Sequence, residues 1–538
     1  MSVFLLRTPI LLSCLVLLAC SQPAPPAETP PAPAPVESTP AVAAAAPVTP
    51  PPVVPPATRK RPPLTPAIND LQERTFRYFW NTANEKNGLV PDRHPGTEPF
   101  SSIAAVGFAL TVYPIGVERG WITRQQARAR TLTTLRFFHD APQGPDAAGM
   151  AGYKGFFYHF LHMETGRRYA PWVELSSVDT ALLLGGVLFA QSWYDRSHKD
   201  EVEIRRLAEA IFERVEWPWL QVRPPLISMG WFPESGFIEH DWRGYNEAMI
   251  VYLLALSSPK HAVGPEVWAA WTQDYDRSWG IFHDQEHLGF GPHFGHQYSH
   301  LWIDYRGLRD DYMRARGMDY FENSRRATYA QRAYAIENPL GWEGYGENVW
   351  GLTASDGPQV TFQNYQESPR EFRHYSARGA GLSDAFDDGT IAPTAAAASL
   401  PFAPEIVIPA IETMRTQFGD HIYGEYGFLD AFNPSFDFTN VKLQHGRIVD
   451  GLWVDGDYLG IDQGPIVLMI ENHRSGFVWS VMRRNPHIVR GLKRAGFTGG
   501  WLDAATADGV ADLGARPAVA PRPATAPAHD PRAASAGR

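Results

Sequence analysis

Cysteine is almost absent from this sequence. Cys14 and Cys20 are its only two cysteines in 538 residues, and both fall within the first 20 positions. The remaining chain therefore cannot form a disulfide, even in an oxidising compartment. Its stability must come from a large hydrophobic core.

Positive charge is also in short supply, since the formal net charge is −10 and the sequence contains no basic cluster. That balance argues against nucleic acid as the main partner. The sequence lacks a Walker-type phosphate loop, a GxSxG nucleophile elbow and an HExxH zinc motif. His293, His296 and His300 could share a helical face, but Gly295 interrupts them. We therefore expect these histidines to pack or to bond sugar hydroxyls, and we predict no metal and no cofactor.

The two ends of the chain differ from its middle in composition. Residues 1–20 contain Arg7 and then an apolar stretch, which is typical of a secretory signal. Residues 21–63 and 504–538 are rich in proline and alanine and have few large apolar side chains, so we expect a disordered tether and a disordered tail. One folded domain is expected over residues 64–503.

The signal ends in Leu-Leu-Ala-Cys, which resembles a bacterial lipobox with Cys20 as the lipidated residue. Ser21 follows it, which suggests the outer membrane by resemblance to proteobacterial lipoproteins. We expect an exported, lipid-anchored protein that faces the periplasm or the cell surface. A plain cleaved signal peptide is the alternative.

Apolar periodicity in the middle of the chain predicts two alternating kinds of helix. Amphipathic helices are expected at 65–82, 123–139, 201–217, 265–279, 318–336 and 404–418. Runs that are apolar on all sides, and therefore buried on all sides, are expected at 103–113, 181–190, 248–256, 300–305, 395–400 and 466–470. The last run is expected to begin at Gly464-Pro465, because proline suits a first helical turn.

This alternation predicts an all-α fold in which an inner ring of helices lies inside an outer ring, an (α/α)6 barrel. A simple α-solenoid is the alternative, but no fixed repeat is evident. Parallel inner helices would gather their N-termini, and the long loops before them, at one end. Loops of that length are usually functional.

Carboxylates are frequent in those loops and in the first turns of the apolar helices. One such group has an ordinary explanation, because acids favour helix N-termini. Several acids that converge with aromatic side chains are instead what glycoside cleavage requires: one protonated carboxyl and one ionised carboxylate, with rings that stack on sugars. The sequence does not supply the distance between them.

Several long motifs carry a resemblance to a known family: TVYPIGVERGWI, ELSSVDTALLLGG, GFIEHDWRGYNEAM, YGENVWGLTASDGP, DGTIAPTAAAASLPFAPE and LGIDQGPIVLMIENHRSG. Over residues 66–500 the chain resembles bacterial glucoamylase-like domain proteins, and among them glycoside hydrolase family 144, the endo-β-1,2-glucanases. The resemblance implies an (α/α)6 barrel, a periplasmic or surface location, and metal-free, inverting hydrolysis of β-1,2-glucan.

On these grounds Asp462 is the expected general base and Glu247 the expected acid or its proton-relay partner, with Glu174 and Asp179 as further catalytic candidates. The remaining candidates would stack on sugar rings or bind sugar hydroxyls. They are Trp231, Glu239, His240, Asp241, Trp242, Arg243, Tyr245, Asn246, His293, Tyr345, Glu347, Trp350 and Asp356.

Three other functions remain open at this point. A transglycosylase could use the same scaffold, and so could a sugar epimerase or isomerase. A non-catalytic lipoprotein could capture glycan. We expect the protein to act as a monomer on a β-glucan.

Overall fold

The computed structural model describes residues 64–96, 99–382 and 385–505. The expected signal, Cys20, the tether and nearly all of the tail lie outside these residues. Within the described part, no helix is both long enough and apolar enough to cross a membrane. The α-helices are α1 (Pro66–Thr82), α2 (Ile103–Arg119), α3 (Arg124–Asp140), α4 (Ser177–Trp193), α5 (Lys199–Glu213), α6 (Met249–Ser257), α7 (Glu266–Thr272), α8 (Asp311–Arg316), α9 (Tyr320–Glu337), α10 (Pro393–Ala397), α11 (Pro404–Ile422), α12 (Gly460–Arg474), α13 (Phe477–Met482) and α14 (Pro486–Arg494).

Local capping explains why several of these helices begin where the sequence predicts. Ser102 caps α2 and Ser176 caps α4 through side-chain oxygens that accept from backbone N–H groups. Thr123 and Gln126 form a reciprocal capping box at α3. The predicted amphipathic and apolar helices at these positions are confirmed.

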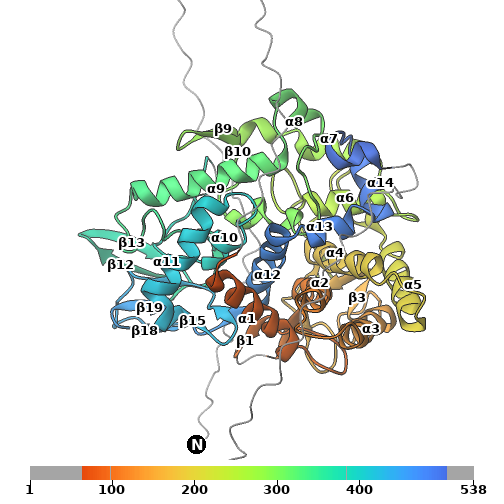
Figure 1. Cartoon of the computed structure of the whole chain (residues 1–538), viewed down its shortest axis with the longest axis horizontal. Coiled ribbons are helices and arrows are strands. Elements are labelled where there is room, and N and C mark those ends of the chain that lie inside the picture. The colour runs from red at the N-terminus through yellow and green to blue at the C-terminus, as the bar shows by residue number, and fades with distance from the viewer. Residues whose placement is uncertain (1–63, 97–98, 383–384, 506–538) are drawn as a thin grey trace, which may run out of the picture.

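The apolar helices pack against one another in the interior. Helix α2 contacts α4 and α12, α4 also contacts α6, and α12 also contacts α10. Helices α1, α3, α5, α11 and α14 pack on the outside of this set, and Figure 1 shows α12 in its middle. The molecule is therefore mostly helical, with its core between an inner and an outer group of helices.

Two expected inner helices differ from the prediction. No α-helix forms at 300–305. Two short 3-10 turns, η3 (His293–His296) and η4 (Tyr298–His300), lie at and before the start of that range. Gln297, between those turns, donates instead to the Ala395 carbonyl and to the Ser399 hydroxyl, both at 2.8 Å, which ties this segment to α10. These tertiary hydrogen bonds take the place of some of the backbone hydrogen bonds that an α-helix would make here. The two turns are short, as 3-10 turns normally are.

Helix α12 begins four residues earlier than predicted. It starts at Gly460, so Gly464 and Pro465 lie inside it. The Gly460 N–H donates to the Asp92 carbonyl at 2.6 Å, which fixes the start of the helix against the N-terminal part of the chain. Pro465 removes one helical hydrogen bond, a loss that the surrounding burial offsets.

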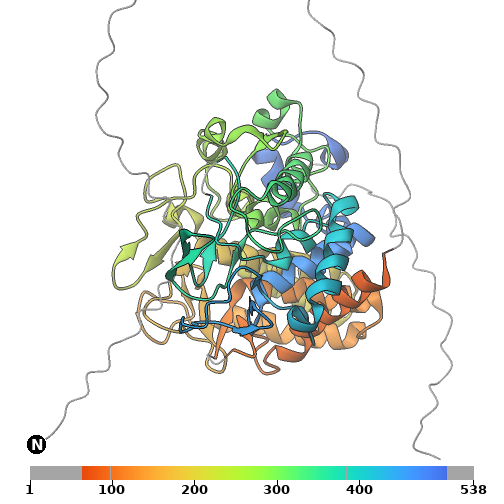
Figure 2. The same ribbon diagram turned by 90° about the vertical axis from the view of Figure 1, so that its left-hand side faces the viewer.

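The expectation of a purely α-helical fold is wrong in one respect, because the loops form many short strands. The largest sheet has the order β3-β4-β6-β7-β8. Figure 2 shows the hairpins mainly on one side of the molecule and the helices on the other. The strands are β1 (Arg93–His94), β2 (Phe100–Ser102), β3 (Gly152–Tyr153), β4 (Phe156–Tyr158), β5 (Phe160–His162), β6 (Leu175–Ser176), β7 (Gly230–Phe232), β8 (Gly236–Phe237), β9 (Trp279–Phe282), β10 (Gln285–Leu288), β11 (Ala354–Ser355), β12 (Thr361–Tyr365), β13 (Ser368–Phe372), β14 (Ser376–Ala377), β15 (Tyr423–Gly424), β16 (Gly427–Phe428), β17 (Phe432–Asn433), β18 (Arg447–Val449), β19 (Leu452–Val454) and β20 (Tyr458–Leu459).

Candidate active site

The N-terminal ends of several inner elements meet at one end of the molecule. The Thr394 hydroxyl at the start of α10 donates to the Asp462 carbonyl at 3.1 Å, in the first turn of α12. The Ser299 hydroxyl in η4 donates to the Glu247 carbonyl at 3.3 Å, just before α6. Asp462 and Glu247 therefore each lie where two of these elements meet.

The centre of the site is a pair of buried aspartates. Asp430 follows the hairpin of β15 and β16, Asp462 lies in the first turn of α12, and their side chains hydrogen-bond to each other. Burial and the mutual repulsion of the two charges raise the pKa of Asp462 well above its usual range, and burial also raises the pKa of Asp430. Ionisation of either carboxylate therefore disfavours ionisation of the other.

This result changes the physical reason for the expected base. A helix N-terminus favours an ionised Asp462, but the helix dipole contributes only about 0.3–1 kcal/mol. Desolvation and a neighbouring carboxylate act in the opposite direction and are larger. Asp462 therefore ionises less readily while Asp430 is ionised.

Arg93 on β1 supplies positive charge beside the pair. Its guanidinium donates to Asp356 at 2.8 Å and lies 3.4 Å from Asp92 and 3.5 Å from Asp457. The Asp356 N–H in turn donates to Asp430 at 2.6 Å. One arginine thus holds three carboxylates around the aspartate pair.

A second group of charges surrounds His159. Its Nδ1 lies 2.8 Å from Glu174, and its Nε2 lies 3.4 Å from Asp179. Burial alone would lower the pKa of His159, but Asp179 and Glu174 raise it to about 9. His159 is therefore an imidazolium at neutral pH that partly neutralises the two carboxylates.

Glu247, just before α6, carries another buried carboxyl. It is buried, and its Oε2 has no hydrogen-bond partner among the described residues. Burial raises the pKa of Glu247 to about 7, and the charge of Asp179 adds to that rise. Glu247 can therefore hold a proton at neutral pH and release it to a bound molecule.

Three acids lie within electrostatic range of the buried Tyr298 hydroxyl. Burial raises the pKa of Tyr298, and the charges of these acids, which are Asp462, Glu247 and Asp179, raise it further. The first two expected catalytic residues, which are 215 positions apart in the chain, are thus within electrostatic range of one side chain. A proton donor and a proton acceptor at one site can perform general acid–base catalysis.

Two groups of side chains have ligand atoms close enough to hold a metal ion. They are His159 with Glu174 and Asp179, and His445 with Asp356 and Asp455, each within 4.8 Å. In the first group the imidazolium already contacts both carboxylates, and in the second Arg93 already contacts Asp356. In both groups, a positively charged side chain of the protein therefore already balances part of the carboxylate charge.

Several expected substrate-binding residues instead build the core. Trp242 donates to the Ser177 hydroxyl at 2.8 Å, Tyr245 bonds His296 at 3.2 Å, and Trp350 is 1% exposed. Their buried rings leave no face open for a sugar, so their expected stacking role is corrected. Trp231 is half-buried and packs against Tyr153 and Trp219.

Most of the other residues expected to bind the sugar are likewise held by contacts within the protein. Asn246 accepts from the Ala248 N–H at 3.0 Å just before α6, His293 lies 3.2 Å from Thr328, and Tyr345 donates to Asp387 at 2.6 Å. These side chains shape the structure around the acids. Among the remaining candidates, Asp241 pairs with Arg223, Arg243 with Asp274 and Glu347 with Arg332. Glu239, Arg243 and Glu347 are exposed, whereas Asp241 is mostly buried and His240 is half-buried and bonds through its backbone carbonyl.

The sequence reasoning missed His159, Arg93, Asp430, Asp455 and Asp457. Asp430 stands in GFLDAFN and the last two in WVDGDYLGID, directly before α12. Clustering of acids before an apolar helix was the signal that could have identified them. Nothing local marks His159 or Arg93, because their partners are distant in the chain.

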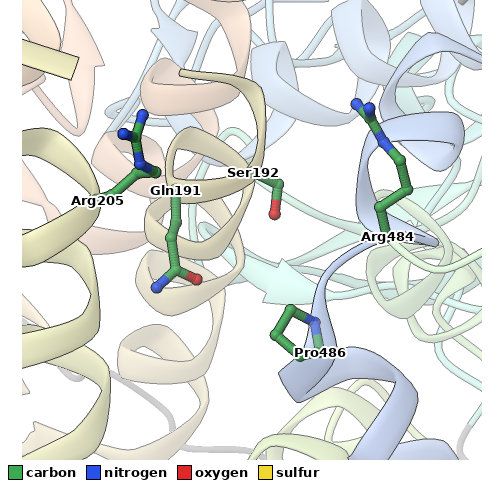
Figure 3. A pocket seen from close by; sticks show the side chains of 5 residues that line it. All are labelled: Gln191, Ser192, Arg205, Arg484 and Pro486. Atoms are coloured by element: carbon green, nitrogen blue, oxygen red, sulfur yellow. The ribbon is translucent and has the colours of Figure 1, made fainter. Parts of the chain in front are cut away.

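A shallow pocket of about 310 Å³ lies elsewhere, lined by Gln191, Ser192, Arg205, Arg484 and Pro486 (Figure 3). Gln191 is in the last turns of α4, about 18 Å along that helix from Asp179. The pocket has no carboxylate and no aromatic ring. It is therefore separate from the acid cluster.

Comparison with known proteins gives matches to a family model, to solved structures and to a curated protein. The family model Glycoamylase, described as "Putative glucoamylase", matches residues 239–486. A solved "putative glucoamylase" from Bacteroides uniformis ATCC 8492 is 32% identical, with a TM-score of 0.69, over 81% of this chain and 98% of that chain. An endo-β-1,2-glucanase from Chitinophaga pinensis, solved with sophorotriose and glucose, is 28% identical, with a TM-score of 0.68, over 81% of this chain and 98% of that chain.

A curated relative from Parabacteroides distasonis, the exo β-1,2-glucooligosaccharide sophorohydrolase (non-reducing end), is 30% identical over 458 residues. The match covers 79% of this chain and 57% of the relative. The chain thus spans a little over half the length of that relative.

Proposed function

The chain belongs to the bacterial glucoamylase-like family, and from that membership we propose that the protein hydrolyses internal linkages of β-1,2-glucan and inverts the configuration at the anomeric carbon. One observation carries the proposal. A protonated Glu247 and the hydrogen-bonded Asp430–Asp462 pair lie at the same end of the molecule, within range of Tyr298. Relatives that match most of this chain act on β-1,2-glucans.

Cleavage within the glucan, rather than from its end, is favoured by the extent of the matches. This chain covers 98% of the Chitinophaga pinensis endo-enzyme but only 57% of the exo-acting relative. About two fifths of the exo-enzyme therefore has no counterpart in the match. We assign endo action on that basis.

In the proposed reaction, Glu247 donates its proton to the glycosidic oxygen as the bond to the anomeric carbon breaks. A water molecule attacks that carbon from the opposite face, and the ionised member of the Asp430–Asp462 pair takes its proton. Glu247 leaves the reaction ionised and the pair gains a proton, so solvent resets both groups. Arg93 and His159 limit the negative charge that accumulates around the sugar.

We further propose that the inner helices close into an (α/α)6 barrel. Helix α2 contacts α4, α4 contacts α6, and α6 contacts η4. Gln297 links η4 to α10, α10 contacts α12, and α12 contacts α2. In this arrangement the η3–η4 segment takes the place of one inner helix. The outer helices would then cover the ring.

The lipid anchor also belongs to the proposal. Cys20 would carry the lipid, hold the protein at the outer membrane as a monomer, and leave the domain free to meet glucan. The lipobox-like Leu-Leu-Ala-Cys sequence supports this placement.

The activity is tested by incubating the purified protein with linear and cyclic β-glucans, and by following product length and anomeric configuration by NMR. We expect short β-1,2-linked oligosaccharides released first as the α-anomer. Asp462→Asn should lower kcat at least about 1,000-fold with little change in KM, because the base acts only in the transition state. Longer or cyclic products would indicate transglycosylation instead, and wild-type rates for Asp462→Asn would remove the aspartate from its role.

A further inference from the structure

Tyr375 is a large aromatic residue that remains 41% exposed beside the acid cluster. It directly precedes β14, which pairs antiparallel with β11 so that Ser376 lies opposite Ser355. Tyr375 and Asp356 each lie one residue beyond the Ser376–Ser355 pair, at the same end of this two-stranded sheet. An exposed ring is therefore held next to a buried carboxylate of the site.

Asp356 connects this position to the aspartate pair. Its N–H donates to Asp430 at 2.6 Å, and Asp430 hydrogen-bonds to Asp462. The hydroxyl end of Tyr375 is surrounded by the site, and burial with the charges of Asp462 and Asp430 raises the pKa of Tyr375 well above its usual range. The phenol thus stays a neutral hydrogen-bond donor at every working pH.

The backbone around the tyrosine is fixed rather than free. The fully buried Arg378 donates to the Arg373 carbonyl at 2.9 Å, to the His374 carbonyl at 3.2 Å and to the Ser355 carbonyl at 2.7 Å. The same guanidinium donates to Asp388 at 2.7 Å and 2.8 Å. Because one charged group joins both strands, the tyrosine keeps its position relative to the acids.

We propose that Tyr375 is a substrate-contacting residue, whose exposed ring stacks on a glucose unit beside the acid cluster and whose hydroxyl donates to the sugar bound at the aspartate pair. An aromatic ring with a polar tip suits a sugar, which has an apolar face and a hydroxyl rim. This inference rests on the proposed function and adds a residue to it.

Two substitutions separate the ring from the hydroxyl. Tyr375→Ala should raise KM for β-1,2-glucooligosaccharides about tenfold, since it removes the stacking surface. Tyr375→Phe should leave KM within about twofold and lower kcat about tenfold, since it removes only the hydrogen bond beside the reacting atoms. Before sugar binds, the same hydroxyl would donate to the ionised carboxylate, so its removal should also move the acidic limb of the kcat/KM profile, which reports the free enzyme, to higher pH.

Tyr312→Phe is the matched control, because the Tyr312 hydroxyl bonds Asp276 on the surface at 2.8 Å. Its kinetics should equal those of the wild type. Thermal unfolding of all three variants reports on the fold, and we expect each within a few degrees of the wild type.

The outcomes distinguish this inference from the proposed function. An active wild type with unchanged kinetics and pH profile in both Tyr375 variants would overturn the role of Tyr375 and leave the function intact. If the wild type does not cleave β-1,2-glucan, the function fails, and the role of Tyr375 is judged by calorimetric binding of the same glucan panel. Equal binding by wild type and Tyr375→Ala, or no binding by either, would then overturn the inference as well.

Discussion

Glu247 shows how burial of one side chain can set both reactivity and stability. Its carboxyl is 6% exposed and Oε2 has no partner among the described residues, so the charged form is disfavoured. A pKa of about 7 keeps it protonated where an exposed glutamate would be ionised. Activity that needs this proton should therefore fall as the pH rises above about 7.

The same shift predicts a pH-dependent gain in stability for Glu247→Gln. Between the unfolded pKa of 4.5 and the folded value of about 7, the unfolded state releases the proton and the folded state keeps it, so folding is penalised as pH rises. The penalty approaches about 3 kcal/mol above pH 7. Urea unfolding should show the variant close to the wild type at pH 5 and more stable at pH 8, with activity lost.

A stability difference between Glu247→Gln and the wild type that stays constant from pH 5 to pH 8 would contradict this assignment. Ser480→Ala serves as a control for the pH dependence, because the Ser480 hydroxyl donates to a carbonyl within α13, away from the acids. Its stability difference should not depend on pH.

At the scale of helices, the close approach of α2 and α4 depends on two glycines. A Cβ on Gly186 would lie 1.9 Å from the Gly107 carbonyl oxygen, and one on Gly107 would lie 2.3 Å from the Leu182 carbonyl oxygen. Neither glycine therefore has room for a larger residue between the two helix backbones. The two helices carry the loops of the site, so their spacing also positions its acids.

Gly186→Ala should destabilise the protein by about 2 to 3 kcal/mol, because the backbones must separate. Gly419→Ala is the matched control within α11, where a Cβ would meet nothing closer than 3.7 Å. That variant should gain about 0.5–1 kcal/mol, since alanine has the higher helix propensity. Denaturant titration measures both, and equal effects would contradict the packing argument.

For the whole molecule, the core and the acid cluster described above lie between residues 64 and 505. The lipid anchor that we propose is at Cys20, outside these residues. Anchoring and catalysis should therefore be separable.

Cys20→Ala should move the protein from the membrane fraction to the soluble fraction after cell lysis, because it removes the site of lipidation. The kcat and KM on soluble glucan should not change. Fractionation with immunoblotting and a parallel activity assay measure both. Retention in the membrane fraction would favour another mode of attachment.

The sequence by itself determined where most helices begin, which of them are buried, and that Asp462 and Glu247 stand at helix starts, because caps and periodicity are encoded within 10 to 20 neighbouring residues. Only the tertiary structure decided that Asp430 pairs with Asp462, that His159 joins Glu174 to Asp179, and that Arg93 holds Asp356. These partners come from separate loops, so no local pattern relates them. The structure also decided the protonation of the site, because desolvation and neighbouring charge exceed the helix-end effect that the sequence could indicate.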